Sequence, residues 1–332
     1  MNTFPNEVID IVGIGASTLD RFIVVDHFPT GREVQQAISS TTDGGGPVAT
    51  ALATAGKYGS RTVMIDRIGD DMVGRYILED FQKYNVNTEG IQVDADAKSG
   101  TATILVKEKT EERAVFFERS TAPEPEFLSD YQGLIENASI VHINGRHRHL
   151  MRTAIDIARQ TGTIISLDGG AQRYDDDMEP ITESSHVVIV ARDYAEKYTG
   201  TTNLEEACRI IHARGALIAG VTNGANGSYF VWPDGTAYRC QPFPQEHVVD
   251  TTGAGDSFHG AFLSKLAASI RPVHAPHDES VQPIDILRAL EYKQLEAAAI
   301  FASAVSALNT QGIGGRSALP SLQTALTLAG LE

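Results

Sequence analysis

The sequence has few of the residues that build disulfide-stabilised, zinc-stapled or membrane-spanning proteins. Its 332 residues include only two cysteines, Cys208 and Cys240, with no CxxC pair and no Cys/His cluster. A disulfide framework and a structural zinc site are therefore disfavoured. No apolar run approaches the roughly 18 residues that a membrane-spanning helix needs. The polar start, residues 1–7, lacks the basic and apolar segments of a signal peptide. We expect a cytoplasmic protein that does not bind membranes.

Positive charge is also scarce. The chain carries 27 lysines and arginines against 43 aspartates and glutamates, a formal net charge of −16. This balance repels phosphate backbones, so nucleic-acid binding is disfavoured. An anionic substrate would have to be held by local charge, by backbone N–H groups or by a metal ion.

Apolar residues make up 42% of the chain, enough for a large core. Strands that alternate with helices of about ten residues predict βαβ units and a mainly parallel sheet. The clearest of these strands are 140–143, 164–168, 186–190 and 217–222. Two β-rich pairs, 22–28 with 36–42 and 102–106 with 114–117, predict a separate small sheet. Long helices are predicted over 256–270 and 284–308.

One segment, Asp250–Gly260 (DTTGAGDSFHG), combines glycines, hydroxyl side chains and carboxylates ahead of a strongly helical stretch. Gly253 and Gly255 allow a tight turn in which the N–H groups of residues 253–256 can point at one spot, at a helix N-terminus that favours negative charge. Such amides suit a phosphoryl group in transfer, and Asp256 could accept a proton from an attacking hydroxyl. A lone GxGD is often only a capped turn, but a second carboxylate and two threonines before it favour a functional site.

Two segments give the chain a family resemblance. Asp250–Phe262 (DTTGAGDSFHGAF) resembles the C-terminal signature of PfkB, or ribokinase-like, carbohydrate kinases. Gly44–Gly74 (GGGPVATALATAGKYGSRTVMIDRIGDDMVG) resembles the N-terminal signature. The two occur in the family's order, and the resemblance covers essentially the whole chain. Neither is a Walker or dinucleotide-binding pattern, because no GK[ST] follows the glycines and no strand–GxGxxG–helix unit opens the chain.

The resemblance implies one α/β domain over residues 1–332. It would be a ribokinase-like, three-layer α/β/α, Rossmann-like domain with a small β-sheet lid, formed by about residues 20–43 and 100–119. The resemblance also implies ATP and Mg²⁺, a sugar substrate and, as in many members, K⁺. Apolar residues on the lid strand, such as Phe22 to Val25, could pair with the lid of another subunit, which predicts a homodimer.

Carried over position by position, the resemblance assigns four groups of residues. Asp256 would be the catalytic base, and the anion hole would be formed by Gly253, Ala254 and Gly255. The sugar would contact Asp20, Gly45, Gly46 and Asp256. The nucleotide would contact Asn223, Gly224, Gly227, Thr252, Gly253 and Gly255. A monovalent cation would be held by Asp250, Thr252, Ser306 and Gly315.

The chain departs from the family pattern at two places. Thr50 stands where the family often has Asn, in the predicted helix after the first glycines. Ala191 and Tyr194 stand where the family often has an Asn-x-x-Glu motif, which is thought to organise the water shell of the metal. Asp193 and Glu196 are nearby candidates to replace that motif.

These departures, together with Gly314–Pro320 (GGRSALP), resemble the sulfofructose kinase branch of the family. In that branch an arginine that matches Arg146 helps to hold the sulfonate of the substrate. Arg32, at the tip of the predicted lid hairpin, matches a lysine of the branch more loosely. The alternative for Arg146 is a basic surface loop. The polar lid residue of the branch corresponds here to Phe117 or Glu118, and an acidic Glu118 would oppose an anionic substrate.

We therefore predict an ATP-dependent sugar kinase that transfers the γ-phosphoryl group to a primary hydroxyl of a ketose or related sugar. The acceptor stays open among an anionic ketose such as 6-deoxy-6-sulfofructose, a neutral sugar such as fructose or ribose, and a keto-deoxy sugar acid. A nucleoside kinase is a more distant alternative. A non-catalytic sugar-binding regulator is the alternative from another class, since the Asn-x-x-Glu motif is missing.

Overall fold

A ten-stranded sheet forms the centre of the computed structural model, which describes residues 8–108, 112–271 and 281–331. Residues 1–7, for which we expect no signal peptide, lie outside the described part. The strand order is β14-β13-β12-β11-β10-β9-β1-β4-β5, with β6 also paired to β4. The strands are β1 (Ile9–Ile14), β4 (Thr62–Gly69), β5 (Val86–Asn87), β6 (Ile91–Asp94), β9 (Ala138–Ile143), β10 (Ile164–Gly169), β11 (Val187–Ala191), β12 (Ile218–Thr222), β13 (Ser228–Val231) and β14 (Ala237–Cys240). The pairs β12–β13 and β13–β14 are antiparallel and the other pairs are parallel, so the sheet is mainly parallel, which confirms the predicted α/β class.

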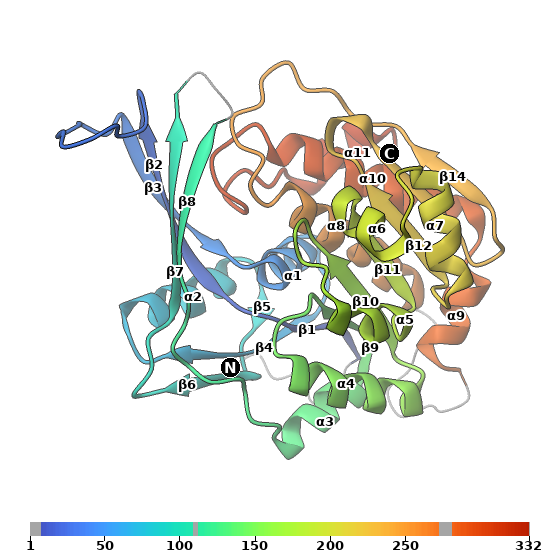
Figure 1. The fold of residues 1–332 in the computed structure, drawn as a ribbon. Coiled ribbons are helices and arrows are strands. Elements are labelled where there is room, and N and C mark those ends of the chain that lie inside the picture. The colour runs from blue at the N-terminus through green and yellow to red at the C-terminus, as the bar shows by residue number, and fades with distance from the viewer. Residues whose placement is uncertain (1–7, 109–111, 272–280, 332) are drawn as a thin grey trace.

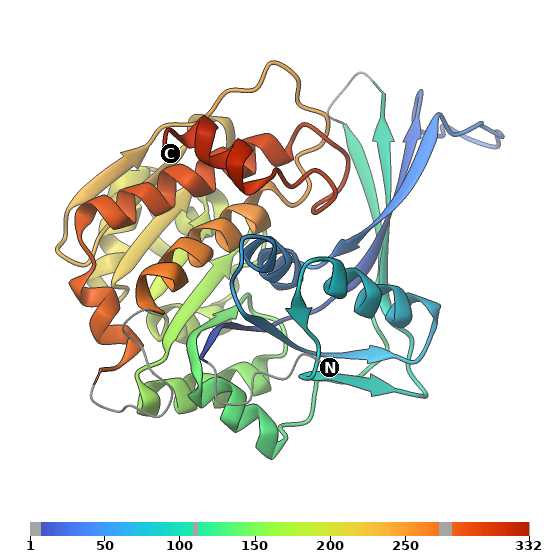
Figure 2. The ribbon, with the colours of Figure 1, turned by 180° about the vertical axis from the view of Figure 1, so that it is seen from behind.

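Helices cover both faces of this sheet, and each face buries its own hydrophobic core (Figures 1 and 2). On one face lie α1 (Pro47–Lys57), α2 (Met72–Lys83), α8 (Ala254–Ile270), α9 (Pro283–Ala289), α10 (Tyr292–Asn309) and α11 (Leu322–Ala329). On the other lie α3 (Ser129–Glu136), α4 (Arg148–Thr161), α5 (Glu179–Glu183), α6 (Arg192–Thr199) and α7 (Leu204–Ala213). Because the parallel strands end at one edge of the sheet, the loops that follow them meet there, which is where ligands bind in such folds.

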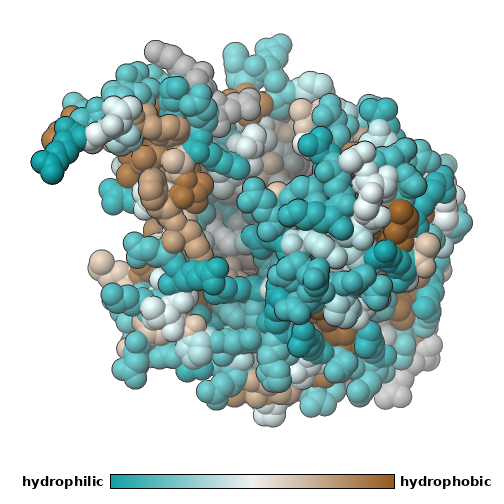
Figure 3. Space-filling view, viewed as in Figure 1, coloured by the Kyte–Doolittle hydropathy of each residue, from teal (hydrophilic) through white to brown (hydrophobic). Residues whose placement is uncertain are grey.

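Four strands form a second sheet that projects from the α/β body (Figure 1). Its order is β3-β2-β7-β8, with β2 (Thr18–Val25), β3 (Ser39–Gly45), β7 (Gly100–Lys107) and β8 (Arg113–Glu118). One face buries Phe22, Ile104 and their neighbours, with Ile313 packed against them. In Figure 3, hydrophobic residues of this sheet border a hollow between the sheet and the body.

Several boundaries differ from the sequence prediction by a few residues, and two of the differences change the description of the fold. The strand expected at 22–28 runs from Thr18 to Val25, so Asp20 lies inside a strand and not in the turn before it. The helix expected over 284–308 is two helices, α9 and α10, because Leu290 is extended. Glu291 starts α10 with a capping box, in which its side chain and that of Gln294 satisfy each other's backbone N–H groups. The cap offsets the loss of helical hydrogen bonds at the break.

Both cysteines are buried and free, as the sequence predicts. Among the described residues, none of the helices has the length and apolar character to cross a bilayer.

Candidate active site

The N-terminus of α8 presents backbone amides without a side-chain cap. Gly253 is the N-cap residue in the left-handed conformation, with φ of 71°. A Cβ at Gly253 would lie 2.5 Å from the Cα of Gly315, so two backbone segments meet there. The amide of Ala254 donates to the carbonyl oxygen of Thr251 at 3.3 Å. In the described chain, the amides of Gly253, Gly255 and Asp256 have no acceptor, which leaves donors for an anion.

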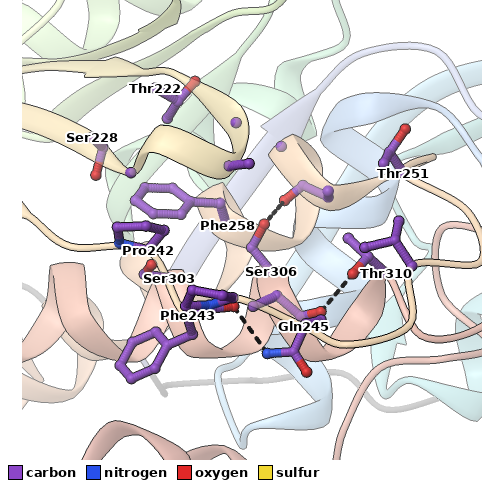
Figure 4. Close-up of a pocket in the computed structure, with 18 residues that line it drawn as sticks. Thr222, Ser228, Pro242, Phe243, Gln245, Thr251, Phe258, Ser303, Ser306 and Thr310 are labelled. Carbon is purple, nitrogen blue, oxygen red and sulfur yellow. Dashed lines mark hydrogen bonds between the residues drawn. The ribbon is translucent and has the colours of Figure 1, made fainter.

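A pocket of about 490 Å³ opens beside these amides (Figure 4). It is lined by backbone and uncharged side chains from η2 (Gly224–Asn226), from the segment after β14, from the start of α8 and from α10. The lining residues are Thr222, Gly224, Ala225, Gly227, Ser228, Pro242, Phe243, Pro244, Gln245, Val248, Thr251, Ala254, Gly255, Phe258, Ser303, Ser306, Ala307 and Thr310. Apolar walls with convergent amides and hydroxyls suit an aromatic base with a phosphate chain that ends at α8.

Asp256 lies next to a second carboxylate, Asp168, at the end of β10. Burial and the charge of Asp168 raise the pKa of Asp256 to about 6. Burial also acts to raise the pKa of Asp168, but the imidazole of His259 outweighs it and lowers that pKa. The Nε2 atom of His259 lies 3.3 Å from Oδ1 of Asp168, and both residues are buried. Near pH 6 Asp256 can therefore change between its acid and base forms, while Asp168 stays ionised.

A second acidic group faces this region from the four-stranded sheet. Asp20 of β2 is paired directly with Asp43 of β3, and Oδ1 of Asp20 accepts a 2.7 Å hydrogen bond from the Thr18 hydroxyl. Burial raises the pKa of Asp20, whereas Thr18 and Arg316 lower it. A carboxylate with lone pairs left over at a partly buried site can accept hydrogen bonds from hydroxyl groups of a ligand.

The glycines before α1 are required by protein contacts. A Cβ at Gly44 would lie 2.1 Å from Arg316 Nη1, and one at Gly45 would lie 2.2 Å from Asp20 Oδ1. Gly46 has φ of +93°, and a Cβ there would lie 2.0 Å from the carbonyl oxygen of Ala16. The turn therefore brings backbone, and no side chains, to the neighbourhood of Asp20.

The strand register of β7 and β8 decides which lid residue faces Asp20. Phe117 pairs with Ala102, which in turn pairs with Asp20, so all three share one face of the sheet. Glu118 pairs with Thr101 and lies on the opposite face. The acidic side chain at 118 therefore does not oppose an anion bound beside Asp20, but the position that faces Asp20 is aromatic and not polar.

Arg113 of β8 connects the four-stranded sheet to the loop before α8. Its Nη1 donates to the hydroxyls of Thr252 (2.9 Å) and Thr251 (3.2 Å), and it lies 3.4 Å from Oδ1 of Asp250. The side chain is 41% exposed, whereas that of Asp250 is 2% exposed. Sequence reasoning missed this contact, because Arg113 and Asp250 belong to different sheets and loops.

The proposed cation ligands lie together, and each of them also makes hydrogen bonds within the protein. The carboxylate of Asp250 accepts from the amides of Thr252 and Gly314, and from the Thr252 hydroxyl. Ser306 donates to the carbonyl oxygen of Ala254, and the carbonyl of Gly315 accepts from Asn309. Because hydroxyl, carbonyl and carboxylate oxygens keep lone pairs beyond these hydrogen bonds, K⁺ binding at this place stays a prediction.

The residues in place of Asn-x-x-Glu do not form a magnesium site either. Tyr194 is buried, and its hydroxyl lies 2.7 Å from that of Thr182. Asp193 accepts from the amide of Gln172 at 2.6 Å, and Glu196 pairs with Arg192 at 3.4 Å. Within residues 8–108, 112–271 and 281–331, no group of three or more His, Cys, Asp or Glu could hold a metal ion. We therefore derive no catalytic step through a protein-bound metal.

Two predicted substrate residues differ in their placement. Arg146 follows β9 at the ligand-binding edge of the sheet, and its amide donates to Oδ1 of Asn144. In the described chain its guanidinium makes no hydrogen bond or ion pair. Arg32 lies in the exposed loop between β2 and β3, which extends away from the body (Figures 1 and 2). The structure therefore does not bring Arg32 to the other site residues.

The remaining predicted residues meet as follows. Gly224, Gly227, Ala254, Gly255 and Ser306 line one pocket, while Asn223, Thr252 and Gly253 do not line it. Sequence reasoning missed His259, although it stands in the DTTGAGDSFHG segment. It also missed the pocket segment Pro242–Gln245, which carries no motif.

Comparison with known proteins gives one consistent family. Residues 8–322 match the model of the pfkB family carbohydrate kinases. The chain is 28% identical to 5-dehydro-2-deoxygluconokinase of Bacillus subtilis, over 80% of this chain and 86% of that protein. It is 26% identical to fructokinase-2 of Solanum habrochaites, over 92% and 93%. The solved structure of Arabidopsis thaliana ribokinase complexed with ribose and ATP superposes with a TM-score of 0.78, at 21% identity over 97% and 99%.

The fold is ribokinase-like, and the chain belongs to the pfkB family of carbohydrate kinases. It is thus a sugar kinase, as the sequence predicts.

We call the unpaired amides of Gly253, Gly255 and Asp256 the phosphoryl cradle. Substitutions of its two glycines are expected to have different effects. Gly253→Ala is expected to lower the free energy of unfolding by about 2 kcal/mol, because its φ is positive and its Cβ would meet Gly315.

Gly255→Ala is expected to preserve stability, since no atom lies within 4 Å of its Cβ, but to weaken ATP binding, because the methyl group enters the pocket. Denaturant unfolding and calorimetric titration with ATP measure the two effects. Equal stability of the two variants would contradict this description of the cradle.

Proposed function

We propose that the protein transfers the γ-phosphoryl group of ATP to a primary hydroxyl of a ketose or related sugar. The observation that carries the proposal is Asp256, a carboxylate with a raised pKa, among unpaired amides at the start of α8 and beside the 490 Å³ pocket. The kinase family supports the reaction class. The amides can donate hydrogen bonds to the phosphoryl oxygens as their negative charge grows, and the carboxylate can accept the proton of an attacking hydroxyl.

In this reaction the ionised Asp256 accepts a hydrogen bond from the acceptor hydroxyl, orients it and takes its proton as the oxygen attacks the γ-phosphorus. The O–P bond to the acceptor forms as the bond from the γ-phosphorus to the β,γ-bridging oxygen breaks, so that ADP leaves with that oxygen. The amides of Gly253, Gly255 and Asp256 donate to the phosphoryl oxygens. Mg²⁺, which we expect to enter with ATP, would neutralise part of the phosphate charge when bound.

The acceptor would lie between Asp256 and Asp20, under the face of the four-stranded sheet that carries Phe117. Asp20 would accept hydrogen bonds from sugar hydroxyls. The sheet would act as a lid, and the contact of Arg113 with Thr251 and Thr252 would join it to the phosphoryl-transfer loop when the site excludes water.

An anionic acceptor is the substrate class that we favour. The guanidinium of Arg146 is unpaired in the described chain, and Glu118 faces away from Asp20. A planar guanidinium with several N–H donors suits a sulfonate, phosphate or carboxylate. A keto-deoxy sugar acid, through its carboxylate, also belongs to this anionic class, whereas a neutral hexose or pentose is the other outcome of the test below.

We also infer a homodimer through the four-stranded sheet. Its edge strand β8 exposes Val115, Phe116 and Phe117, each more than half exposed, and an exposed apolar edge favours pairing with another strand.

Asp256→Asn is expected to lower kcat by about 100-fold or more, because the general base is lost. The unfolding temperature above pH 6 should be unchanged or higher, because the substitution removes repulsion between Asp256 and Asp168. Coupled detection of ADP with a panel of sugars, together with thermal unfolding, measures both. Near-normal turnover by the variant would remove Asp256 from the mechanism.

The pH dependence of kcat/KM should reveal the interaction between the carboxylates of Asp256 and Asp168. Since Asp256 must be ionised to act, kcat/KM is expected to fall as pH decreases through about 6. Asp168→Asn removes the negative charge that raises the pKa of Asp256, so this acidic limb should move to lower pH. Asp285→Asn, on the exposed side of α9, serves as the control and should leave the limb in place. A limb that Asp168→Asn does not move, or moves to higher pH, argues against the pairing.

Arg146→Ala tests the charge of the acceptor. With an anionic acceptor, KM should rise by about tenfold or more while the KM for ATP stays constant, because a charge-assisted hydrogen bond is lost. Arg152→Ala, an exposed arginine of α4, is the matched control and should change neither constant. An unchanged acceptor KM in Arg146→Ala would refute the anion contact and leave a neutral sugar.

A further inference from the structure

Arg316 is a buried cation that follows Gly315, the residue packed against Gly253, and neither the family motifs nor the proposed reaction assigns it a task. Its side chain is 1% exposed. It donates from Nε to the hydroxyl of Thr50 (3.1 Å), from Nη1 to Asp80 (2.6 Å) and from Nη2 to the carbonyl oxygen of Gly45 (2.8 Å). It also lies over the ring of Phe81, 5.3 Å from the centroid. Three acceptors on α1, α2 and β3 are thus held by one planar group.

The backbone around Arg316 is hydrogen-bonded to Asp43, the residue before the glycine turn of residues 44–46. Oδ2 of Asp43 accepts from the amides of Arg316 and Ser317, both at 2.9 Å. Oδ1 of Asp43 accepts from the amide of Gly44 at 2.9 Å. Asp43 is 2% exposed, so these bonds are shielded from water. One end of the loop 314–317 is therefore fixed to the glycine turn beside Asp20.

The other end of this loop is fixed to the phosphoryl cradle. The amide of Gly314 donates to Oδ2 of Asp250 at 3.0 Å. Gly315 lies against Gly253, so closely that Gly253 has no room for a side chain. A displacement of the cradle would therefore press directly on the residue before Arg316.

We propose that Arg316 is a positioning residue that couples the phosphoryl cradle at Gly253 to the glycine turn at Gly45, which borders the proposed acceptor site. The loop 314–317 passes a shift at the cradle to the guanidinium, and the guanidinium sets the position of the Gly45 carbonyl and of the start of α1. Thr50 takes part as the acceptor for Nε. Nucleotide binding at α8 thereby orders the turn that borders the acceptor site. The assignment of the turn to the acceptor rests on the proposed function, whereas the coupling itself does not.

Charge supports the same arrangement. The charge of Arg316 acts to lower the pKa of both Asp20 and Asp256, so the guanidinium lies within electrostatic reach of the proposed acceptor ligand and of the proposed base. A buried cation of this kind must be compensated, and Asp80 provides the close partner.

The test uses Arg316→Lys in the full-length protein. Lysine keeps the positive charge but cannot hold Thr50, Asp80 and the Gly45 carbonyl at once. The matched control is Arg271→Lys, which alters another arginine–aspartate pair, with Asp10, just beyond the C-terminus of α8 and away from the cradle. Both substitutions are expected to reduce stability, so a loss of stability alone does not distinguish the two roles.

Amide hydrogen exchange with and without a non-hydrolysable ATP analogue provides the decisive readout. In the wild type, the analogue should slow exchange at residues 44–50 as well as at 222–228 and 253–257. In Arg316→Lys the protection at 44–50 should be lost while that at 222–228 remains, and Arg271→Lys should behave as the wild type. Protection at 44–50 that persists in Arg316→Lys, or is absent from the wild type, overturns the coupling.

Steady-state kinetics separates this inference from the proposed function. Arg316→Lys should raise the KM for the acceptor by about tenfold, with the KM for ATP changed less than about twofold, because the lost hydrogen bonds are on the acceptor side. If the wild type phosphorylates no sugar, the proposed function fails, and hydrogen exchange still decides the coupling. If Arg316→Lys does not fold, Thr50→Val, which removes a single acceptor, should show the same loss of protection to a smaller extent. Unchanged protection in Thr50→Val would then overturn the coupling.

Discussion

The approach of Gly253 to Gly315 is the constraint on which the site depends. It holds Gly253, the N-cap residue of α8, in the left-handed conformation ahead of amides that have no acceptor in the described chain, and it fixes the loop that carries Arg316. From there the buried guanidinium reaches the glycine turn. The anion cradle and the acceptor side are thus parts of one hydrogen-bonded assembly, and Asp43 and Asp250 anchor its two ends.

The electrostatics of the site follow from the placement of carboxylates beside that assembly. Asp168 is kept ionised by His259, and its negative charge helps to raise the pKa of Asp256 to about 6. Two neighbouring carboxylates in different surroundings can thus differ in protonation at the same pH, so that one exchanges a proton while the other stays charged. The net charge of the protein is strongly negative, so the free amides and Arg146 matter for any anionic ligand, because they are local donors in an otherwise repulsive field.

Local patterns in the sequence predicted the α/β class, the ligand-binding edge and the start of α8, since glycine positions and hydrophobic periodicity are properties of short segments. The break at Leu290 was missed, although Glu291 and Gln294 have the spacing of a capping box. The strand shift that places Asp20 in β2 depends on pairing with Ser39–Gly45, a segment of low strand propensity that tertiary contacts hold extended. The Asp168–His259 pair and the contacts of Arg316 join residues far apart in the chain, so no local pattern could reveal them.

The central claim is that the amides at the start of α8 receive the migrating phosphoryl group while Asp256 faces the acceptor. A crystal structure with ADP, aluminium fluoride and a sugar tests it most directly, because the fluoride complex imitates the planar phosphoryl group. The account predicts fluorines within hydrogen-bonding distance of the Gly255 and Asp256 amides, and a sugar hydroxyl between the aluminium and the Asp256 carboxylate. A complex bound elsewhere, or a carboxylate turned away from the sugar, would contradict it.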